Sequence, residues 1–251
     1  MYLALFFVLG LIFGSFYTNL GIRLCKKESI IGPASHCDNC NHKLKFYELI
    51  PVFSYVFLKG KCSNCKKSID IIYPVLELFT ALLFMLAFYV FGFDLKLMIA
   101  LILSSLFVIT VATDLNYYII PDSVLVVTGI LIFIYNILDK GFKDASIYII
   151  HGAIMFIFMY ALMLVGNALF KKESLGGGDI KLVGVLSMIF PVMLSFVSLT
   201  LAAFIALAPA IYLSVKKKDN IVPFGPFIII AFLIIFYSGV TAREVLNLFT
   251  F

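Results

Sequence analysis

Two aspartates stand where a carboxylate is costly, and their positions could support chemistry. Asp179 follows three consecutive glycines, Gly176–Gly178, and precedes an apolar stretch, while Asp114 stands at the end of another apolar stretch. In a sequence that is 63% hydrophobic and only 13% charged, an acid beside a membrane segment is expected to be functional. Glycine permits backbone angles that are closed to other residues and lets another segment approach closely. We therefore expect the glycines to shape a tight loop around Asp179.

Two neighbouring carboxylates can share one proton and hydrolyse a peptide bond. The ionised acid takes a proton from water, and the protonated acid polarises the scissile carbonyl. Asp114 closes a predicted helix and Asp179 opens one, and the helix dipole favours an anion at the opening end. We therefore predict a proteolytic dyad at a membrane surface, with Asp179 ionised and Asp114 protonated. Membrane-edge acids also serve proton-coupled transporters, so a transporter whose zinc loop recruits a partner is the alternative.

Four cysteines form two Cys-x-x-Cys pairs in the one substantial polar segment. Pairs at this separation match a tetrahedral site of four thiolates, which is typical of structural zinc because no position is left open for water. Two disulfides are the alternative, but a reducing compartment disfavours them. Cys25 is left over and is interpreted as a bystander thiol. The predicted ligands are Cys37, Cys40, Cys62 and Cys65.

Eight apolar runs indicate a polytopic membrane protein, since a helix needs about 20 apolar residues to cross a bilayer core. We predict an all-α fold of about eight transmembrane helices with a small zinc-stapled cytoplasmic loop domain. The first helix would cover residues 1–22, the zinc loop 23–70, and helices two to eight residues 71–251. The apolar runs are 2–22, 72–93, 95–113, 122–138, 146–170, 180–192, 194–215 and 222–239.

The distribution of cations predicts the orientation, because cytoplasmic segments carry an excess of Lys and Arg. With both termini external, 15 of the 19 Lys and Arg residues lie inside. This orientation places both aspartates and the zinc loop at the cytoplasmic face of the cell membrane. The net charge of +5 then reflects topology rather than a nucleic-acid partner. The lipid bilayer is the expected surroundings, and no oligomer is predicted.

Four further features are candidates for a role in the site. Residues 44–58 are too apolar for a free loop, so they either lie on the membrane or pack under the helices. Glu77 is an intramembrane acid, for which we expect a structural or substrate-positioning role. Asp122 follows a proline at a predicted helix start, where it either caps the helix or joins the site. Pro223 and Gly225 break the backbone before the last run, where they could line a substrate cleft.

The chain resembles the bacterial type IV prepilin peptidases, which are bifunctional leader peptidases and N-methyltransferases of the GxGD aspartyl protease class. The resemblance runs from Gly14 to about Phe227. The order of its motifs is more specific than any one of them. They are the paired Cys-x-x-Cys motifs, the segments 42–55, 73–78 and 114–122, the glycine-rich segment 176–182, and Val222-Pro-Phe-Gly-Pro226.

The resemblance implies the roles of several residues. Asp114 and Asp179 match the catalytic aspartates, and the active-site loop would comprise Gly176, Gly177, Gly178 and Lys181. Prepilins and pilin-like proteins would be cut after a glycine, ahead of a hydrophobic helix. The new N-terminal residue would then be methylated from S-adenosylmethionine. The substrate or methyl-transfer region would include Gly60, Lys61, Glu77, Asp122, Pro223 and Gly225.

The chain departs from the family pattern at two places. Thr18 stands where the family usually has Asn, with Asn19 shifted by one, and Cys25 replaces a proline. Both lie outside the proteolytic motifs, so the expectation of cleavage is unaffected.

Overall fold

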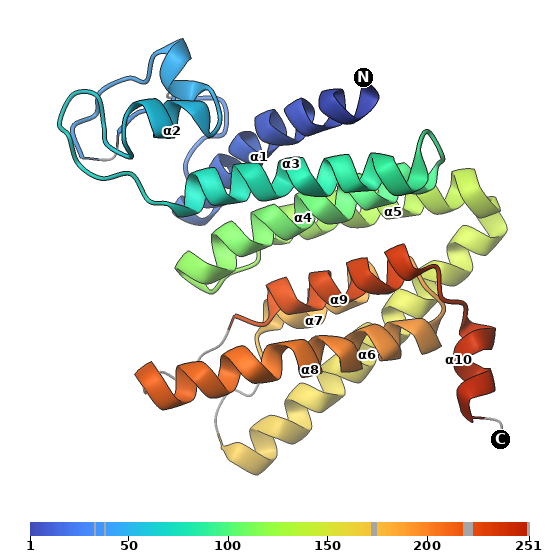
Figure 1. The fold of residues 1–251 in the computed structure, drawn as a ribbon. Coiled ribbons are helices and arrows are strands. Elements are labelled where there is room, and N and C mark those ends of the chain that lie inside the picture. Colours follow the sequence, from blue (N-terminus) through green and yellow to red (C-terminus); the bar gives the residue numbers. More distant parts are fainter. Residues whose placement is uncertain (33, 38, 172–174, 218–222, 250–251) are drawn as a thin grey trace. The chain divides into compact units, whose positions relative to one another are not determined.

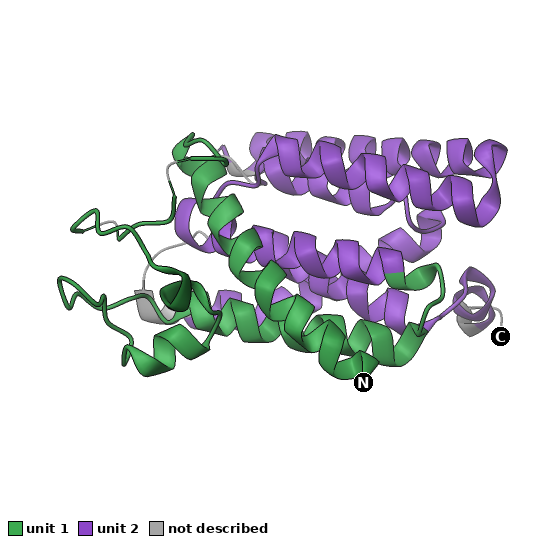
Figure 2. Ribbon diagram, turned by 90° about the horizontal axis from the view of Figure 1, so that it is seen from above, with its two compact units in different colours: residues 1–97 green, residues 98–251 purple. Residues whose placement is uncertain are grey.

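The computed structural model describes residues 1–32, 34–37, 39–171, 175–217 and 223–249. Contacts between Cα atoms divide the chain into two compact units, residues 1–97 and 98–251 (Figure 2). The division falls near the start of α4 (Lys96–Tyr117). Each unit is described by itself.

Unit 1 consists of two long helices joined by the cysteine-containing loop (Figure 1). The long helices are α1 (Tyr2–Lys26) and α3 (Ile72–Phe91), and the loop contains the 3-10 helix η1 (Phe46–Leu49) and the short helix α2 (Phe53–Phe57). A Gly-x-x-x-Gly spacing explains how closely the long helices pack. A Cβ added to Gly10 would lie 2.5 Å from the Cα of Ala81, so the two backbones are nearly in contact.

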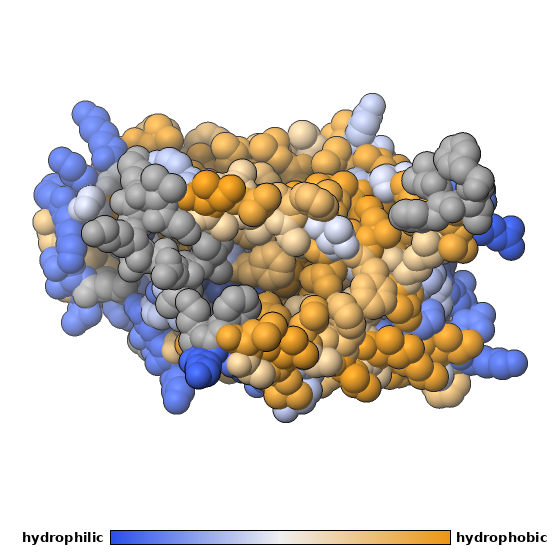
Figure 3. Space-filling view, turned by 90° about the horizontal axis from the view of Figure 1, so that it is seen from below, coloured by the Kyte–Doolittle hydropathy of each residue, from blue (hydrophilic) through white to orange (hydrophobic). Residues whose placement is uncertain are grey.

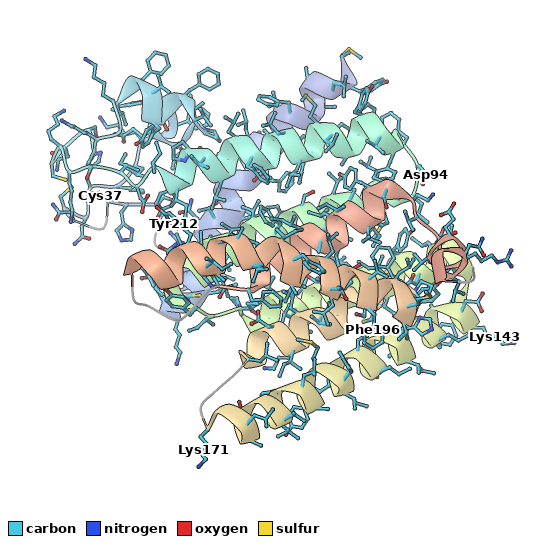
Figure 4. All side chains as sticks on the ribbon, turned by 60° about the horizontal axis from the view of Figure 1, so that its bottom comes forward. Cys37, Asp94, Lys143, Lys171, Phe196 and Tyr212 are labelled. Carbon is cyan, nitrogen blue, oxygen red and sulfur yellow. The ribbon has the colours of Figure 1, made fainter. Side chains whose placement is uncertain are left out.

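Unit 2 is a bundle of apolar helices and ends in α10 (Ala242–Phe249). Figure 1 shows α4, α6 and α8 running toward one end of this unit, while α5, α7 and α9 start there. Figure 4 marks the direction of α6, because Lys143 lies near its beginning and Lys171 at its end. The bounds are α4 Lys96–Tyr117, α5 Asp122–Lys140, α6 Phe142–Phe170, α7 Gly177–Leu186, α8 Val192–Lys217 and α9 Gly225–Ser238.

Every one of the eight predicted apolar runs contains a helix. Six helices in the described part of the chain are long and apolar enough to cross a membrane. The other two differ from the prediction in length. α7 ends at Leu186 after ten residues, and α9 has 14. At about 1.5 Å per residue, α7 extends about 15 Å and α9 about 21 Å, short of a hydrocarbon core about 30 Å thick.

The apolar surface fits a multi-pass membrane protein. Apolar side chains cover much of the face seen in Figure 3. Large apolar side chains are exposed along the long helices, including Ile157 of α6 and Phe204 of α8. A bilayer would cover such side chains, and charged groups at the helix ends would meet water and headgroups.

Candidate active site and metal site

Asp114 and Asp179 line one cavity at the end of unit 2 where α5, α7 and α9 begin. The cavity has a volume of about 410 Å³. Asp114 lies in the last turn of α4, and Asp179 lies in the first turn of α7, as the sequence predicts for both helices. The other lining residues are Tyr118, Ile119, Ile120, Pro121, Asp122, Gly176, Gly177, Gly178 and Lys181.

Asp114 is buried and is held from the start of α9. The backbone N–H of Gly225 donates a hydrogen bond to Asp114 Oδ2 at 3.2 Å. A Cβ at Gly225 would lie 2.9 Å from Thr110 Cγ2, 3.0 Å from Ile120 Cδ1 and 3.1 Å from Asp114 Oδ2. The position therefore admits only glycine without a shift of its neighbours. This N–H stabilises an ionised Asp114, because hydrogen bonds to the charged form favour that form.

Asp179 lies in different surroundings. It stands at the opening of α7, outside the six helices that are long enough to cross a membrane. Burial, followed by the negative charge of Asp114, raises the pKa of Asp179 to about 7. Asp179 therefore keeps a proton at a pH at which an exposed aspartate has lost its own. The helix-dipole argument assigned the proton to Asp114, whereas the raised pKa of Asp179 and the Gly225 N–H at Asp114 favour Asp179.

The glycines before Asp179 leave room for neighbouring atoms and do not adopt unusual backbone angles. Gly176 has φ −68° and ψ 136°, and none of the three glycines has a positive φ. A Cβ at Gly178 would lie 3.2 Å from the Cβ of Ile120, and one at Gly176 would lie 3.2 Å from Asp179 Oδ2. The expectation of close approach is therefore right, and the freedom of backbone angles that glycine permits is not used here.

Asp122 and Lys181 form an ion pair at the mouth of the cavity. Lys181 Nζ donates to both carboxylate oxygens of Asp122, at 2.7 and 2.8 Å. Both side chains are exposed, so the pair orients two charges at the rim and adds little to stability. Asp122 is the first residue of α5, yet the helix has no side-chain cap. Of the two roles considered for Asp122, capping is therefore not observed.

A second cavity adjoins the ion pair. Its volume is about 500 Å³, and Asp122 and Lys181 line it as well as the first cavity. Its other lining residues are apolar or small and come from three helices. They are Leu125, Val126 and Gly129 of α5, Ile149, Gly152, Ala153 and Phe156 of α6, and Gly184, Val185 and Met188 in and after α7.

The four predicted metal ligands lie together in the loop of unit 1. Their Sγ atoms are all within 4.8 Å of one another, with 3.8 Å between Cys37 and Cys65 and 4.0 Å between Cys40 and Cys62. Four thiolates about 2.3 Å from a central zinc ion would be about 3.8 Å apart in a tetrahedron. All five cysteines of the chain are free, so the disulfide alternative is not observed. The cluster can hold a metal such as zinc.

Both Cys-x-x-Cys knuckles have the same backbone design. In the first, Cys37 N–H donates to the carbonyl of His42, and Asn41 N–H donates to the carbonyl of Cys37. Cys62 makes the equivalent bonds with Lys67 and Lys66 in the second knuckle. The residue after the second cysteine has a positive φ in both, 53° at Asn41 and 59° at Lys66. Two copies of one turn thus point four sulfur atoms at a common centre.

Known proteins match nearly the whole chain. A family model described as the bacterial peptidase A24 N-terminal domain matches residues 8–91, and one described as the type IV leader peptidase family matches residues 101–211. A prepilin leader peptidase/N-methyltransferase of Bacillus subtilis is 35% identical over 230 residues, which cover 90% of each chain. This chain belongs to the type IV leader peptidase family.

Two other relatives carry the same description. The prepilin leader peptidase/N-methyltransferase of Myxococcus xanthus is 38% identical over 183 residues, covering 72% of this chain and 53% of the relative. That of Neisseria gonorrhoeae is 28% identical over 233 residues, covering 91% and 81%. No solved structure matches the chain. The family resemblance inferred from the ordered motifs is thereby confirmed.

The candidate residues fall into three groups in this family member. Asp114, Asp179, the three glycines and Lys181 meet at the dyad cavity, with Asp122 at its rim. Gly225 supports Asp114 from outside that lining, while Pro223 precedes α9 and is not among the lining residues. Gly60, Lys61 and Glu77 belong to unit 1.

Sequence reasoning missed some contributors to the dyad cavity. Tyr118 has φ 54° and terminates α4 just after Asp114, and Ile120 contacts both Gly178 and Gly225. Thr110, one turn before Asp114, fills the space beside Gly225. Ile120 belongs to the Ile-Pro-Asp segment, where the proline and the aspartate are recognisable in the sequence. The apolar residue before them has no comparable signal.

Proposed function

We propose that this chain is an aspartic endopeptidase that removes the leader peptide of prepilins and pilin-like proteins at the cytoplasmic membrane face. The observation that carries the proposal is one cavity lined by both Asp114 and Asp179, which come from separate helices, with Asp114 accepting a hydrogen bond from the Gly225 backbone N–H. The descriptions of its relatives, prepilin leader peptidase/N-methyltransferase, supply the substrate class.

The dyad suggests different roles for the two acids, one as base and one as acid. Asp114, which accepts the Gly225 N–H, would be the base that takes a proton from water. The resulting hydroxide would attack the carbonyl carbon of the scissile glycine residue while protonated Asp179 donates to the carbonyl oxygen. Collapse of the tetrahedral intermediate would re-form the C=O bond and break the C–N bond, returning a proton from the diol to Asp179 while the amine leaves with the proton from Asp114. Because the acids titrate as a pair, the assignment describes one microstate.

The adjoining apolar cavity suggests where the substrate would lie. Cleavage ahead of a hydrophobic helix requires an apolar site next to the dyad, and the cavity between α5, α6 and α7 supplies one. The Asp122–Lys181 pair lies between the two cavities, at the place where a leader would meet the mature segment. This arrangement supports Asp122 and Lys181 as substrate-positioning residues.

Methylation of the new N-terminus is the second proposed activity, and it rests on the family. The residues suggested for S-adenosylmethionine, Gly60 and Lys61, do not offer it a cradle. Gly60 has φ 67°, and a Cβ there would lie 2.9 Å from the hydroxyl oxygen of Tyr55 rather than in free space. The backbone of Lys61 forms an isolated antiparallel β-bridge with that of Ser68. Both residues belong to the turn of the second knuckle, so neither is assigned to binding S-adenosylmethionine.

A prepilin peptide assay tests both activities. The detergent-purified protein is incubated with the peptide and S-adenosylmethionine, and the products are read by mass spectrometry. We expect a product cut after glycine and heavier by one methyl group, with no cut product from Asp114→Asn or Asp179→Asn. Undiminished turnover in both variants would refute the protease. Substrate flux in proteoliposomes without cleavage would instead favour the proton-coupled transporter.

We also propose that the cysteine cluster holds structural zinc. Elemental analysis should find about one zinc per chain, and Cys62→Ser should lose it because three thiolates bind more weakly than four. The matched control is Cys25→Ser, which removes the cysteine outside the cluster. A folded, active and metal-free protein would contradict the proposal.

A further inference from the structure

We infer that the segment Phe46–Phe57, here called the aromatic segment, inserts into the headgroup region of an anionic bilayer leaflet and holds the zinc loop on the membrane surface. The sequence left open whether these residues lie on the membrane or pack under the helices. Their exposure, their attachment to α3 and the charges that flank them favour the membrane.

The aromatic segment exposes its apolar side chains instead of burying them. The side chain of Phe46 is 85% exposed and that of Phe57 is 81% exposed. η1 and α2 contact one another, so the apolar side chains of both belong to one local structure. A cluster of this kind in a water-exposed loop would be unfavourable, whereas the headgroup–acyl boundary accepts aromatic and aliphatic groups. The remaining exposed members are Tyr47, Leu49, Ile50, Phe53 and Val56.

One buried contact attaches the segment to a membrane-spanning helix. The backbone N–H of Val52, between η1 and α2, donates to Glu77 Oε2 at 2.7 Å. Glu77 is buried and lies five residues into α3, about 8 Å along the helix axis at about 1.5 Å per residue. The aromatic segment is therefore fixed beside the first two turns of α3, the level at which a spanning helix enters the lipid.

This contact also explains the intramembrane acid. Glu77 accepts a hydrogen bond from the Val52 backbone, and both residues belong to unit 1. Its role here is to hold the loop at the helix, which agrees with the structural role considered for it from the sequence.

The charges around the segment select the kind of lipid. Lys43 and Lys45 precede it, Lys59 and Lys61 follow it, and all four are exposed. The one acid between Lys43 and Lys61 is Glu48, which is buried and accepts the backbone N–H of Lys45 at 2.7 Å. The exposed charge of this stretch is thus entirely positive. Lysines beside an apolar insertion favour anionic headgroups.

Tryptophan fluorescence tests this inference directly, because the chain has no tryptophan. Phe57→Trp places a single emitter in the aromatic segment, and Asn64→Trp places one at an exposed position of the second knuckle as the matched control. Each full-length variant is reconstituted in vesicles of phosphatidylcholine and phosphatidylglycerol with brominated acyl chains. We expect blue-shifted emission and strong lipid quenching for Phe57→Trp, and iodide quenching for Asn64→Trp.

Two results would overturn the inference. Iodide quenching of Phe57→Trp equal to that of the control would place the segment in water. Protection from both iodide and brominated lipid would mean that protein covers it, whether from this chain or from a partner. If Phe57→Trp fails to fold, Phe46→Trp probes the same segment at its other end.

The lipid charge has its own test. We expect the blue shift of Phe57→Trp to decrease when phosphatidylglycerol is replaced by phosphatidylcholine. The same loss should follow from changing all four flanking lysines to glutamine in phosphatidylglycerol vesicles. Emission that responds to neither change would refute the role of anionic lipid.

Discussion

Gly225 connects the start of α9 to the dyad at the scale of a single residue. Its N–H reaches Asp114, and its missing side chain leaves the space that Thr110, Ile120 and the Asp114 carboxylate occupy. A methyl group in that space would displace either α9 or the carboxylate, and the position of a catalytic group matters on the scale of about 1 Å.

Gly225→Ala should therefore reduce kcat for prepilin cleavage by a factor of about 10², the cost of misplacing a catalytic group by about 1 Å. The glycine control is Gly32→Ala, because a Cβ at Gly32 meets nothing within 4 Å. Steady-state cleavage of a prepilin peptide by both variants would measure the effect. Wild-type kcat in Gly225→Ala would show that the contact with Asp114 is dispensable.

The pH dependence of cleavage follows from Asp179. Burial and the charge of Asp114 raise its pKa to about 7. Below that pH the dyad holds the proton that polarises the scissile carbonyl, and above it both carboxylates ionise. We expect kcat/KM to fall as the pH rises through about 7, since this ratio reports the free enzyme. A rate that increases between pH 7 and 9 would contradict the assignment of Asp179 as the acid.

At the scale of elements, α6 packs closely against α7, the helix that carries Asp179. Gly152 of α6 faces Gly184 of α7 so closely that an added Cβ would lie 2.6 Å from the carbonyl oxygen of Gly184. Backbone atoms cannot move aside as the end of a flexible side chain can. The separation of these two helices is therefore set by two glycines.

Gly152→Ala should destabilise the bundle by about 1–3 kcal/mol, the usual cost of overpacking. Gly129→Ala is the matched control in the same cavity lining, because its Cβ would meet only Val185 side-chain atoms at 3.9 Å. Thermal unfolding in detergent compares the two. Equal midpoints for both variants would mean that α6 and α7 separate without cost.

For the whole molecule, the sequence predicts the positions of the long helices better than it predicts the lengths of the short ones. Each of the eight apolar runs found by hydropathy contains a helix, because a segment in lipid must satisfy its own backbone. Hydropathy overestimated α7, because the apolar stretch from Ile180 continues beyond Leu186, where the backbone turns before Pro191. Composition does not distinguish a helix from the apolar turn that follows it.

The site was predictable in its residues and less so in its contacts. Spacing and residue type found the two aspartates and the four cysteines, because an intramembrane acid and paired Cys-x-x-Cys motifs have few other uses. The contact between Gly225 and Asp114 joins residues 111 positions apart, and no local pattern specifies it. The proton assignment made from the helix dipole differs from the one that the raised pKa of Asp179 supports, since the helix dipole is local and burial is not.

The orientation in the membrane is a prediction at the scale of the whole chain. Alkaline phosphatase inserted at Gly141, between α5 and α6, should be active, because this segment is predicted to be external. The same insertion at Lys171, after α6, should be inactive, because that end is predicted to be cytoplasmic. Activity assays in intact cells distinguish the two. The reverse pattern would invert the topology and move the aspartates to the outer face.

The middle glycine of the motif before Asp179 differs from its neighbours in what it permits. A Cβ at Gly177 meets nothing within 4 Å, and its backbone angles are open to other residues, while Gly177 still lines the dyad cavity. Other residues therefore fit at this position in related chains without disturbing either flanking glycine. For the chemist, the same freedom makes position 177 an attachment point: a cysteine there would carry a tethered inhibitor directly over the two acids.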